Sequence, residues 1–129
     1  KLFVHIFCHQ KFAYFFSTEG SDNWMGRYFF TGGLMPSEDL LSKFQKNLSL
    51  DKQWRWNGRH YKQTSNAWLK NMDREKFNIL PILEEVYGRK ERDTWFQRWR
   101  IFFMACAELF AYKSGNQWFV AHYLFKKKS

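Results

Sequence analysis

Nearly continuous apolar runs near both ends of the chain predict strands that are buried on both faces. Residues 2–8 read LFVHIFC and residues 117–125 read QWFVAHYLF, and both runs are rich in β-branched and aromatic residues. Such runs are typical of strands that lie between helix layers in a parallel or mixed sheet. A third, shorter strand is predicted at residues 52–56, where the turn signal Asn57-Gly58 ends it.

Apolar residues recur at helical spacing in the middle of the chain. Ser37 is a favourable N-cap and acids follow it in the first turn, whereas Gly88 is a favourable helix terminator. The predicted helices span residues 37–48, 64–76, 81–88 and 91–113.

The longest of these helices is apolar nearly all round in its second half, which predicts that it is buried. Glu108 is the only charged residue between Ile101 and Tyr112. A buried carboxylate needs a partner, and we expect Arg98 or Arg100 to supply one.

Aromatic residues make up 22% of the 129 residues, with 15 Phe and 7 Trp. A chain of this length fits one domain. So much aromatic area builds a core, lines a large apolar pocket, or does both.

The chain carries a formal net charge of +9. This excess attracts nucleic acid, an anionic membrane or an acidic partner, or it is a solvated basic face to which the tail Lys126–Lys128 contributes. No nucleic-acid-binding module is recognisable, so nucleic acid is not an expected partner, whereas peripheral membrane contact stays open. The two cysteines suggest no disulfide framework, and no apolar run of membrane-spanning length or signal peptide is visible, so we expect a cytoplasmic location.

Four segments carry motifs in a fixed order: NWMGRYFFTGGLMPS at 23–37, WRWNGRHYKQTSNAWLKNMD at 54–73, WFQRWRIFFMACAELF at 95–110 and WFVAHYLFKKK at 118–128. Together they resemble the C-terminal half of the S-adenosylmethionine-dependent methyltransferases of the cyclopropane fatty acid synthase family. The coclaurine N-methyltransferase-like branch is the most similar.

The resemblance implies an α/β fold that is the C-terminal half of a Rossmann-like class I methyltransferase. Residues 2–8 would be its fifth strand, 52–56 the sixth and 117–125 the antiparallel seventh, inserted between the other two. Residues 1–129 would then form the substrate-facing part, and the half that binds S-adenosylmethionine would lie upstream of Lys1. In agreement, the sequence has no Gly-rich loop after an opening strand. The free edge of strand 2–8 would be an aggregation liability if left bare.

The resemblance also implies two catalytic residues. In the cyclopropane synthases an H-x-[IV] pattern helps to hold bicarbonate beside the reacting methyl group; His5 matches the histidine, and Phe7 replaces the aliphatic residue. Tyr61 matches the tyrosine of the family pattern G-x-x-Y-x-x-T, which reaches the reaction centre. From the residues alone, a hydrogen-bonded core histidine is the favoured interpretation of His5, and Tyr61 could be an aromatic cap between a strand and a helix.

The expected substrate-binding residues follow from position and from the resemblance. Ligands of open α/β sheets bind beyond the carboxyl ends of strands, which is where Phe7 and His9 lie. Further on, the family's variable pocket wall is matched by an aromatic segment and a glycine turn, from which we select Trp24, Tyr28, Phe30 and Gly33.

No residue is assigned to cofactor or metal binding. A zinc site of His5, Cys8 and His9 is not expected, because strand alternation points the thiol away from both histidines, and only His60 and His122 could add imidazoles.

The expected reaction is methyl transfer from S-adenosylmethionine to an amine nitrogen. The branch's general-base Glu-His pair, in an E-H-M-K-N-Y-like motif, would lie upstream of Lys1. One alternative is cyclopropane synthesis on lipid alkenes with bicarbonate as base, and another is a non-catalytic basic binding module. The expected partners are a small amine or lipid substrate and the upstream half of the same enzyme, with a homodimer left open.

Overall fold

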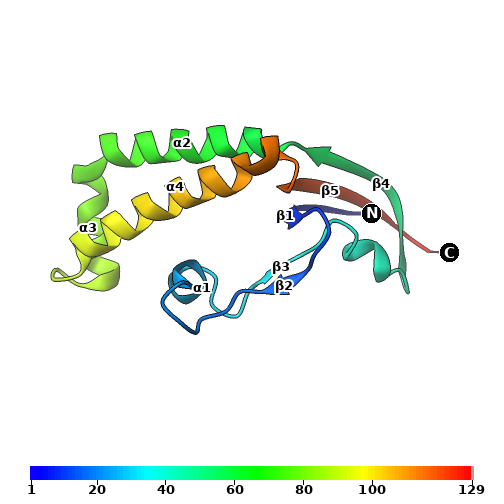
Figure 1. The fold of residues 1–129 in the computed structure, drawn as a ribbon, viewed down its shortest axis with the longest axis horizontal. Helices are drawn as coiled ribbons and strands as arrows, with labels where there is room; N and C mark the ends of the chain where they lie inside the picture. Colours follow the sequence, from blue (N-terminus) through cyan, green and yellow to red (C-terminus); the bar gives the residue numbers. More distant parts are fainter. Residues whose placement is uncertain (129) are drawn as a thin grey trace.

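The computed structural model describes residues 1–128 and shows a small sheet at one end of the molecule and a helical arm at the other (Figure 1). The elements, in chain order, are β1 (Leu2–His9), β2 (Tyr14–Phe15), α1 (Trp24–Tyr28), β3 (Leu34–Met35), a 3-10 helix (Leu41–Lys43), β4 (Leu48–Trp56), α2 (Gly58–Arg74), α3 (Lys76–Tyr87), α4 (Arg92–Gly115) and β5 (Trp118–Lys127).

The main sheet has the strand order β1-β5-β4, and both pairings are antiparallel. The prediction that the last strand is inserted between the first strand and the strand before α2 is therefore confirmed. The register places His5 opposite His122 and His122 opposite Trp54, so these three residues form one row across the sheet. The short strands β2 and β3 form a separate antiparallel ribbon.

One face of the sheet is covered by the segment that joins β3 to β4. Arg55 of β4 pairs with Glu38 of this segment, with 3.0 Å between Nε and Oε1, and the buried Tyr123 hydroxyl donates to the Glu38 carbonyl at 2.6 Å. The core on this face consists of Cys8, Phe119, Ala121, Tyr123 and Phe125, with Leu41 packed against it.

The opposite face is largely open among residues 1–128, with Phe3, Trp54 and Trp56 at 42–56% exposure. The prediction of two buried faces is therefore wrong for β1 in this part of the chain and correct for most of β5; β4, for which only a strand was predicted, is largely exposed. The reason is that α2 and α4 pack against β5, the central strand, and much less against β1 and β4.

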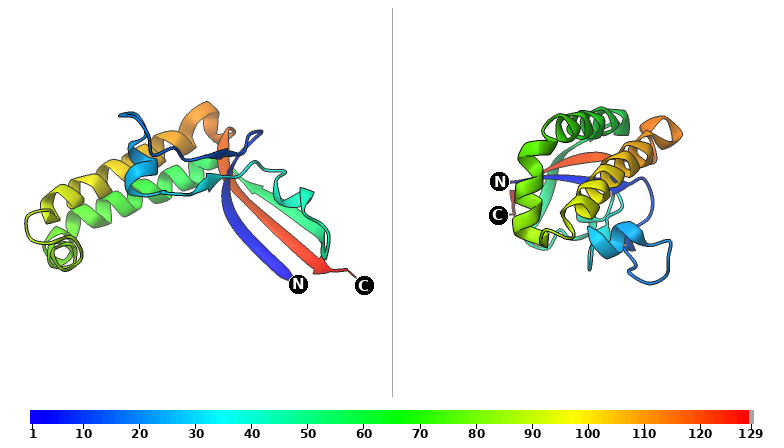
Figure 2. Two further views of the ribbon diagram at one scale, coloured as in Figure 1. Left: turned by 90° about the horizontal axis from the view of Figure 1, so that it is seen from below. Right: turned by 90° about the vertical axis from the view of Figure 1, so that its left-hand side faces the viewer.

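In the helical arm, α2 and α4 run side by side and α3 joins them at the far end (Figures 1 and 2). Buried Met72, Leu83 and Phe96 tie the three helices together. The Arg100 guanidinium also donates to both carboxylate oxygens of Asp73, at 2.7 and 3.3 Å. None of the helices within residues 1–128 is long and apolar enough to cross a membrane.

The predicted helix at 37–48 does not form; only residues 41–43 make a 3-10 turn. Ser37 is held in a parallel bridge to His9, and the Glu38 N–H donates to the His9 carbonyl at 2.9 Å. The Ser37 hydroxyl donates to Asp39 instead of capping a helix. Docking of this segment on the end of β1 thus overrides its local helix signal.

Burial of the second half of α4 on all sides was also predicted wrongly. Glu108 is exposed, and Ile101 and Met104 are 46% and 41% exposed. The predicted partners of Glu108 bind elsewhere: Arg100 pairs with Asp73, and the Arg98 guanidinium lies 4.2 Å from the Tyr28 ring centre.

Candidate active site

Both residues predicted to be catalytic line the same pocket. Its volume is about 410 Å³, and it lies between the open face of the sheet and the first turns of α2. His5 comes from β1 and Tyr61 from α2, more than fifty positions apart in the sequence. The pocket is lined by His5, Trp56, His60, Tyr61, Thr64, Trp68, Val120 and His122.

A tight junction between β4 and α2 positions Tyr61 at this pocket. Asn57 caps α2 by accepting the Arg59 N–H at 2.9 Å. Gly58 lies so close to the chain that a Cβ there would be 2.2 Å from the Phe110 carbonyl oxygen and 2.3 Å from that of Trp118. The helix therefore starts in contact with both α4 and β5, and Tyr61 follows one turn later.

Two histidines and an indole form a hydrogen-bonded chain on the sheet side of the pocket. Nδ1 of His5 lies 2.7 Å from Nε2 of His122, and the Trp56 indole N–H donates to Nδ1 of His122 at 3.0 Å. Burial, and secondly the neighbouring charge of His5, lower the pKa of His122. His122 is therefore neutral at neutral pH.

Tyr61 lines this pocket, and its hydroxyl is protonated at neutral pH. Its half-buried ring packs edge-on against Phe110, with 4.5 Å between ring centres, and against Trp68 at 5.9 Å. Burial, and secondly the electrostatic influence of Cys106, raise the pKa of Tyr61. At neutral pH the phenol is therefore a hydrogen-bond donor.

A second, narrower cavity of about 70 Å³ lies against Tyr61 and is almost entirely apolar. Phe7 and Phe30 line it, with 6.0 Å between their ring centres. These two predicted substrate-binding residues are thus connected to the His5 pocket through the Tyr61 side chain, which lines both cavities.

The other predicted wall residues lie further away. A Cβ on Gly33 would be 3.0 Å from the Phe30 carbonyl oxygen and 3.1 Å from the Phe16 ring, so the glycine permits Phe16 to stack on Phe30. Trp24 lines a different surface pocket, of about 360 Å³, and Tyr28 packs edge-on against Trp95 and beneath the Arg98 guanidinium. Neither of these two side chains lines the His5 pocket.

His9 has a structural position. Its Nδ1 accepts the backbone N–H groups of Lys11 and Phe12 at 3.0 and 2.9 Å, and Nε2 lies 3.2 Å from the Gln117 side-chain amide. The ring is only 5% exposed. Both nitrogens are therefore used to hold the turn after β1, and His9 lines neither the His5 pocket nor the narrow cavity.

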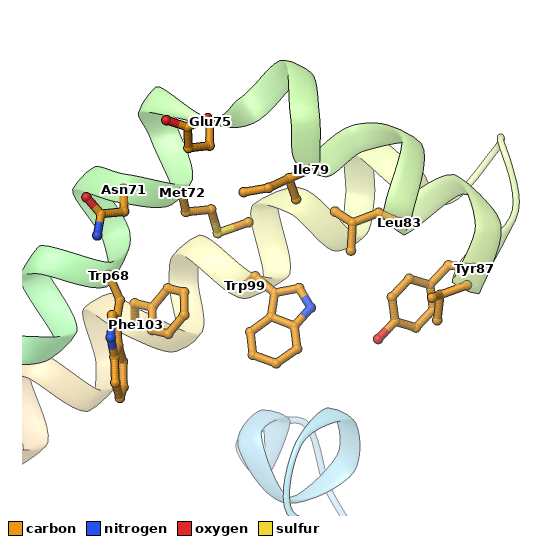
Figure 3. Close-up of a pocket in the computed structure, with 10 residues that line it drawn as sticks. Trp68, Asn71, Met72, Glu75, Ile79, Leu83, Tyr87, Trp99 and Phe103 are labelled. Atoms are coloured by element: carbon orange, nitrogen blue, oxygen red, sulfur yellow. The ribbon is translucent and has the colours of Figure 1, made fainter.

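A hollow of about 720 Å³, larger than the His5 pocket, is an apolar groove among α2, α3 and α4 (Figure 3). Met72, Ile79, Leu83 and Trp99 point into it, and Asn71 and Glu75 lie at its α2 rim (Figure 3). It contains no predicted site residue, but Trp68 lines both this groove and the His5 pocket. The size of the groove alone does not make it the site, because it lacks a converging set of polar groups.

Residues 1–128 offer little to a metal or a nucleotide. Within them, no group of three or more His, Cys, Asp or Glu could hold a metal ion. The one strand-to-helix turn with a glycine, Asn57-Gly58, is filled by the carbonyls of Phe110 and Trp118 and leaves no room for a ligand. Burial raises the pKa of Cys8 to about 12 and that of Cys106 to about 11, so neither thiol is a nucleophile at neutral pH.

No protein-family model matches the sequence. Individual proteins, however, are similar to it over nearly its whole length. The chain is 38% identical over 130 residues to (S)-coclaurine N-methyltransferase of Papaver somniferum. This match covers 98% of the chain and 37% of that protein. It is 34% identical to pavine N-methyltransferase of Thalictrum flavum subsp. glaucum, and this match covers 98% of the chain and 36% of that protein. The crystal structure of coclaurine N-methyltransferase bound to N-methylheliamine and SAH superposes with a TM-score of 0.84 at 33% identity, over 97% of this chain and 37% of that one.

The fold and these similarities define the class: residues 1–128 have the fold of the C-terminal part of the Rossmann-like α/β S-adenosylmethionine-dependent methyltransferases. Within this class, the chain belongs to the coclaurine N-methyltransferase-like family. The resemblance seen in the sequence motifs is thus confirmed. The chain spans 36–37% of the length of the relatives named here.

Sequence reasoning did not select Trp56 or His122 as site residues. Alternation assigns His122 to one face of its strand, but which residues lie beside it in the row across the sheet depends on the register. A bulge between Leu50 and Lys52 shifts the pairing of β4 by one residue, and this shift cannot be read from alternation alone.

Proposed function

We propose that this chain is the substrate-facing part of an S-adenosylmethionine-dependent enzyme that transfers a methyl group to an amine nitrogen. The observation that carries the proposal is that His5 and Tyr61 converge on one aromatic pocket. The names of the relatives, coclaurine and pavine N-methyltransferase, support an amine as the acceptor.

In this proposal the pocket aligns the acceptor. S-adenosylmethionine supplies the methyl group already activated on a sulfonium, so the protein must chiefly position the amine in line with it. The Tyr61 hydroxyl binds an electronegative atom of the acceptor. The ring faces of Trp56, Tyr61 and Trp68 stabilise the positive charge that develops on nitrogen.

The base that takes the amine proton is proposed to come from outside residues 1–128. No carboxylate lines the His5 pocket. We further propose that the cofactor is bound by a preceding half of the enzyme, because the glycine turn before α2 is filled by backbone atoms.

The role of Tyr61 is tested by Tyr61→Phe in the full-length enzyme. Loss of one positioned hydrogen bond of about 1–3 kcal/mol should lower kcat roughly ten- to a hundredfold. The dissociation constant of the cofactor, measured by calorimetry, should stay unchanged, because only the acceptor side loses a contact. Tyr112→Phe is the matched control, since Tyr112 is exposed and lines neither cavity next to Tyr61. Equal kinetics for the two variants would reduce Tyr61 to a structural aromatic.

The reaction type is tested by removing carbonate and bicarbonate. An amine methyltransferase with its own base should keep its rate, and the rate should rise with pH as the amine loses its proton. Incorporation of labelled methyl groups into phospholipid acyl chains, in a bicarbonate-dependent manner, would instead show cyclopropane synthesis.

A further inference from the structure

The hydrogen-bonded chain Trp56–His122–His5 has a fixed direction. An indole N–H can only donate, so Nδ1 of His122 must be an unprotonated acceptor of the 3.0 Å bond. Neutral His122 then carries its proton on Nε2. That proton lies in the 2.7 Å contact with His5, so His122 donates to Nδ1 of His5.

The same reasoning determines the tautomer of His5. Because its Nδ1 accepts from His122, the proton of neutral His5 is on Nε2, on the side of the ring away from His122. This N–H has no partner among residues 1–128. A proton on Nδ1 of His5 would face the N–H of His122 and would require His122 to give up its bond with Trp56.

We propose that Trp56 and His122 are positioning residues that fix His5 as an N–H donor toward the acceptor pocket, so that His5 binds an electronegative atom of the substrate and does not take the amine proton. The inference rests on the proposed function for the identity of the substrate. His5 and Tyr61 then present two donors to one pocket. Two donors match an acceptor that offers lone pairs, and they leave proton removal to another group.

The tautomers can be read directly in the full-length enzyme. With 15N-labelled histidine, two-bond 1H–15N correlation spectra distinguish a protonated from an unprotonated ring nitrogen without substrate or cofactor. We expect both His5 and His122 to show a proton on Nε2 and none on Nδ1. A proton on Nδ1 of either residue in the wild-type protein would overturn the proposal.

Trp56→Phe removes the indole donor and keeps an aromatic ring. We expect His122 and His5 to become mixtures of tautomers, and kcat/KM to fall roughly two- to tenfold for one neutral hydrogen bond. Trp54→Phe is the matched control: Trp54 is on the same strand, faces His122 across the sheet and is 42% exposed, but does not line the pocket. Identical spectra for the two variants would overturn the proposal, as would a shifted tautomer with unchanged kcat/KM.

A pair of His122 variants separates positioning from packing. In His122→Gln the amide oxygen can accept from Trp56 and the amide NH₂ can donate to His5, so the His5 tautomer and kcat/KM should be retained within about twofold. His122→Leu should lose the single His5 tautomer and should also have a lower kcat/KM. Equal tautomers and equal kcat/KM in the two variants would contradict the proposal. If His122→Leu does not fold, the Trp56→Phe and Trp54→Phe pair decides. Wild-type enzyme with the expected tautomers but no methyl transfer to amines would overturn the proposed function alone.

Discussion

Two side-chain hydroxyls on α2 have no hydrogen-bond partner among residues 1–128, and they differ in whether a ligand can reach them. Tyr61 lines the His5 pocket and is only half-buried, whereas Ser65, one turn further along α2, is 1% exposed and its hydroxyl has no hydrogen-bond partner among residues 1–128. An accessible unpaired hydroxyl is available to a ligand. A buried one only costs stability.

We therefore predict that Ser65→Ala stabilises the full-length protein. Removing an unsatisfied buried hydroxyl should raise the free energy of unfolding by about 1 kcal/mol, measured by urea denaturation. The matched control is Ser42→Ala, which removes a hydroxyl that donates to the Asp39 carbonyl at 2.7 Å and should therefore lower stability. A loss of stability in Ser65→Ala would mean that the hydroxyl has a partner outside residues 1–128.

His9 predicts a dependence of stability on acid pH. Burial, and secondly the charge of Lys113, lower its pKa from the ordinary value of 6.5. The unfolded state therefore binds the proton more readily. The stabilising contribution is complete above about pH 6.5 and is lost as the pH falls through the lowered pKa.

We predict that His9→Asn flattens the fall in thermal stability between about pH 7.5 and 5.5. An Asn side chain can still accept a backbone N–H two residues on, but it does not titrate. Thermal unfolding measured across this range should show a smaller slope for the variant. An unchanged slope would assign the pH dependence to other groups.

Among the elements, the junction of β4 with α2 has the greatest effect on the site. It sets the start of α2 against α4 and β5, and so fixes the distance of Tyr61 from the sheet that carries His5. Neighbouring segments show the same dominance of packing over local preference, since residues 37–48 give up a predicted helix to dock on β1.

We predict that Gly58→Ala destabilises the protein by about 1–3 kcal/mol, the usual cost of overpacking, because its Cβ would meet two backbone carbonyls that cannot move independently. Gly33→Ala should cost less, since its closest contacts are 3.0 and 3.1 Å away and one of them is a side chain that can turn. Chemical denaturation of both variants compares them. A smaller loss for Gly58→Ala than for Gly33→Ala would contradict the proposed tightness of the junction.

At the scale of the whole molecule, residues 1–128 expose much large apolar surface. Phe15 and Phe77 are 81% and 87% exposed, and one face of the sheet carries open aromatic rings. Extensive exposed apolar surface marks places where other protein or ligand binds. We expect such contacts on the open face of the sheet, where the His5 pocket lies.

We predict that residues 1–129 alone do not bind S-adenosylmethionine measurably, while the full-length enzyme does. Isothermal calorimetry on both proteins tests this, with circular dichroism to verify that the shorter chain is folded. Micromolar binding to the folded shorter chain would place the cofactor site within these residues and refute the division proposed here.

The sequence by itself determined the main elements and the two central candidate residues. The apolar runs predicted the strands near the two ends of the chain, helical periodicity predicted α4, and four motif segments, one of them around Tyr61, identified the family. These signals are local, because burial imposes a period of 2 or 3.6 on neighbouring positions wherever the chain ends up. Local signals were therefore sufficient to predict these strands, this helix and the family.

Only the tertiary structure decided which residues meet. The row of His5, His122 and Trp54, and the donation from Trp56, depend on a strand register and a bulge that join positions 66 and 117 residues apart. The exposure of Glu108 depends on which side of α4 its neighbours cover. Pairing and packing across such separations are settled by the sum of many contacts throughout the chain, and no local pattern contains that sum.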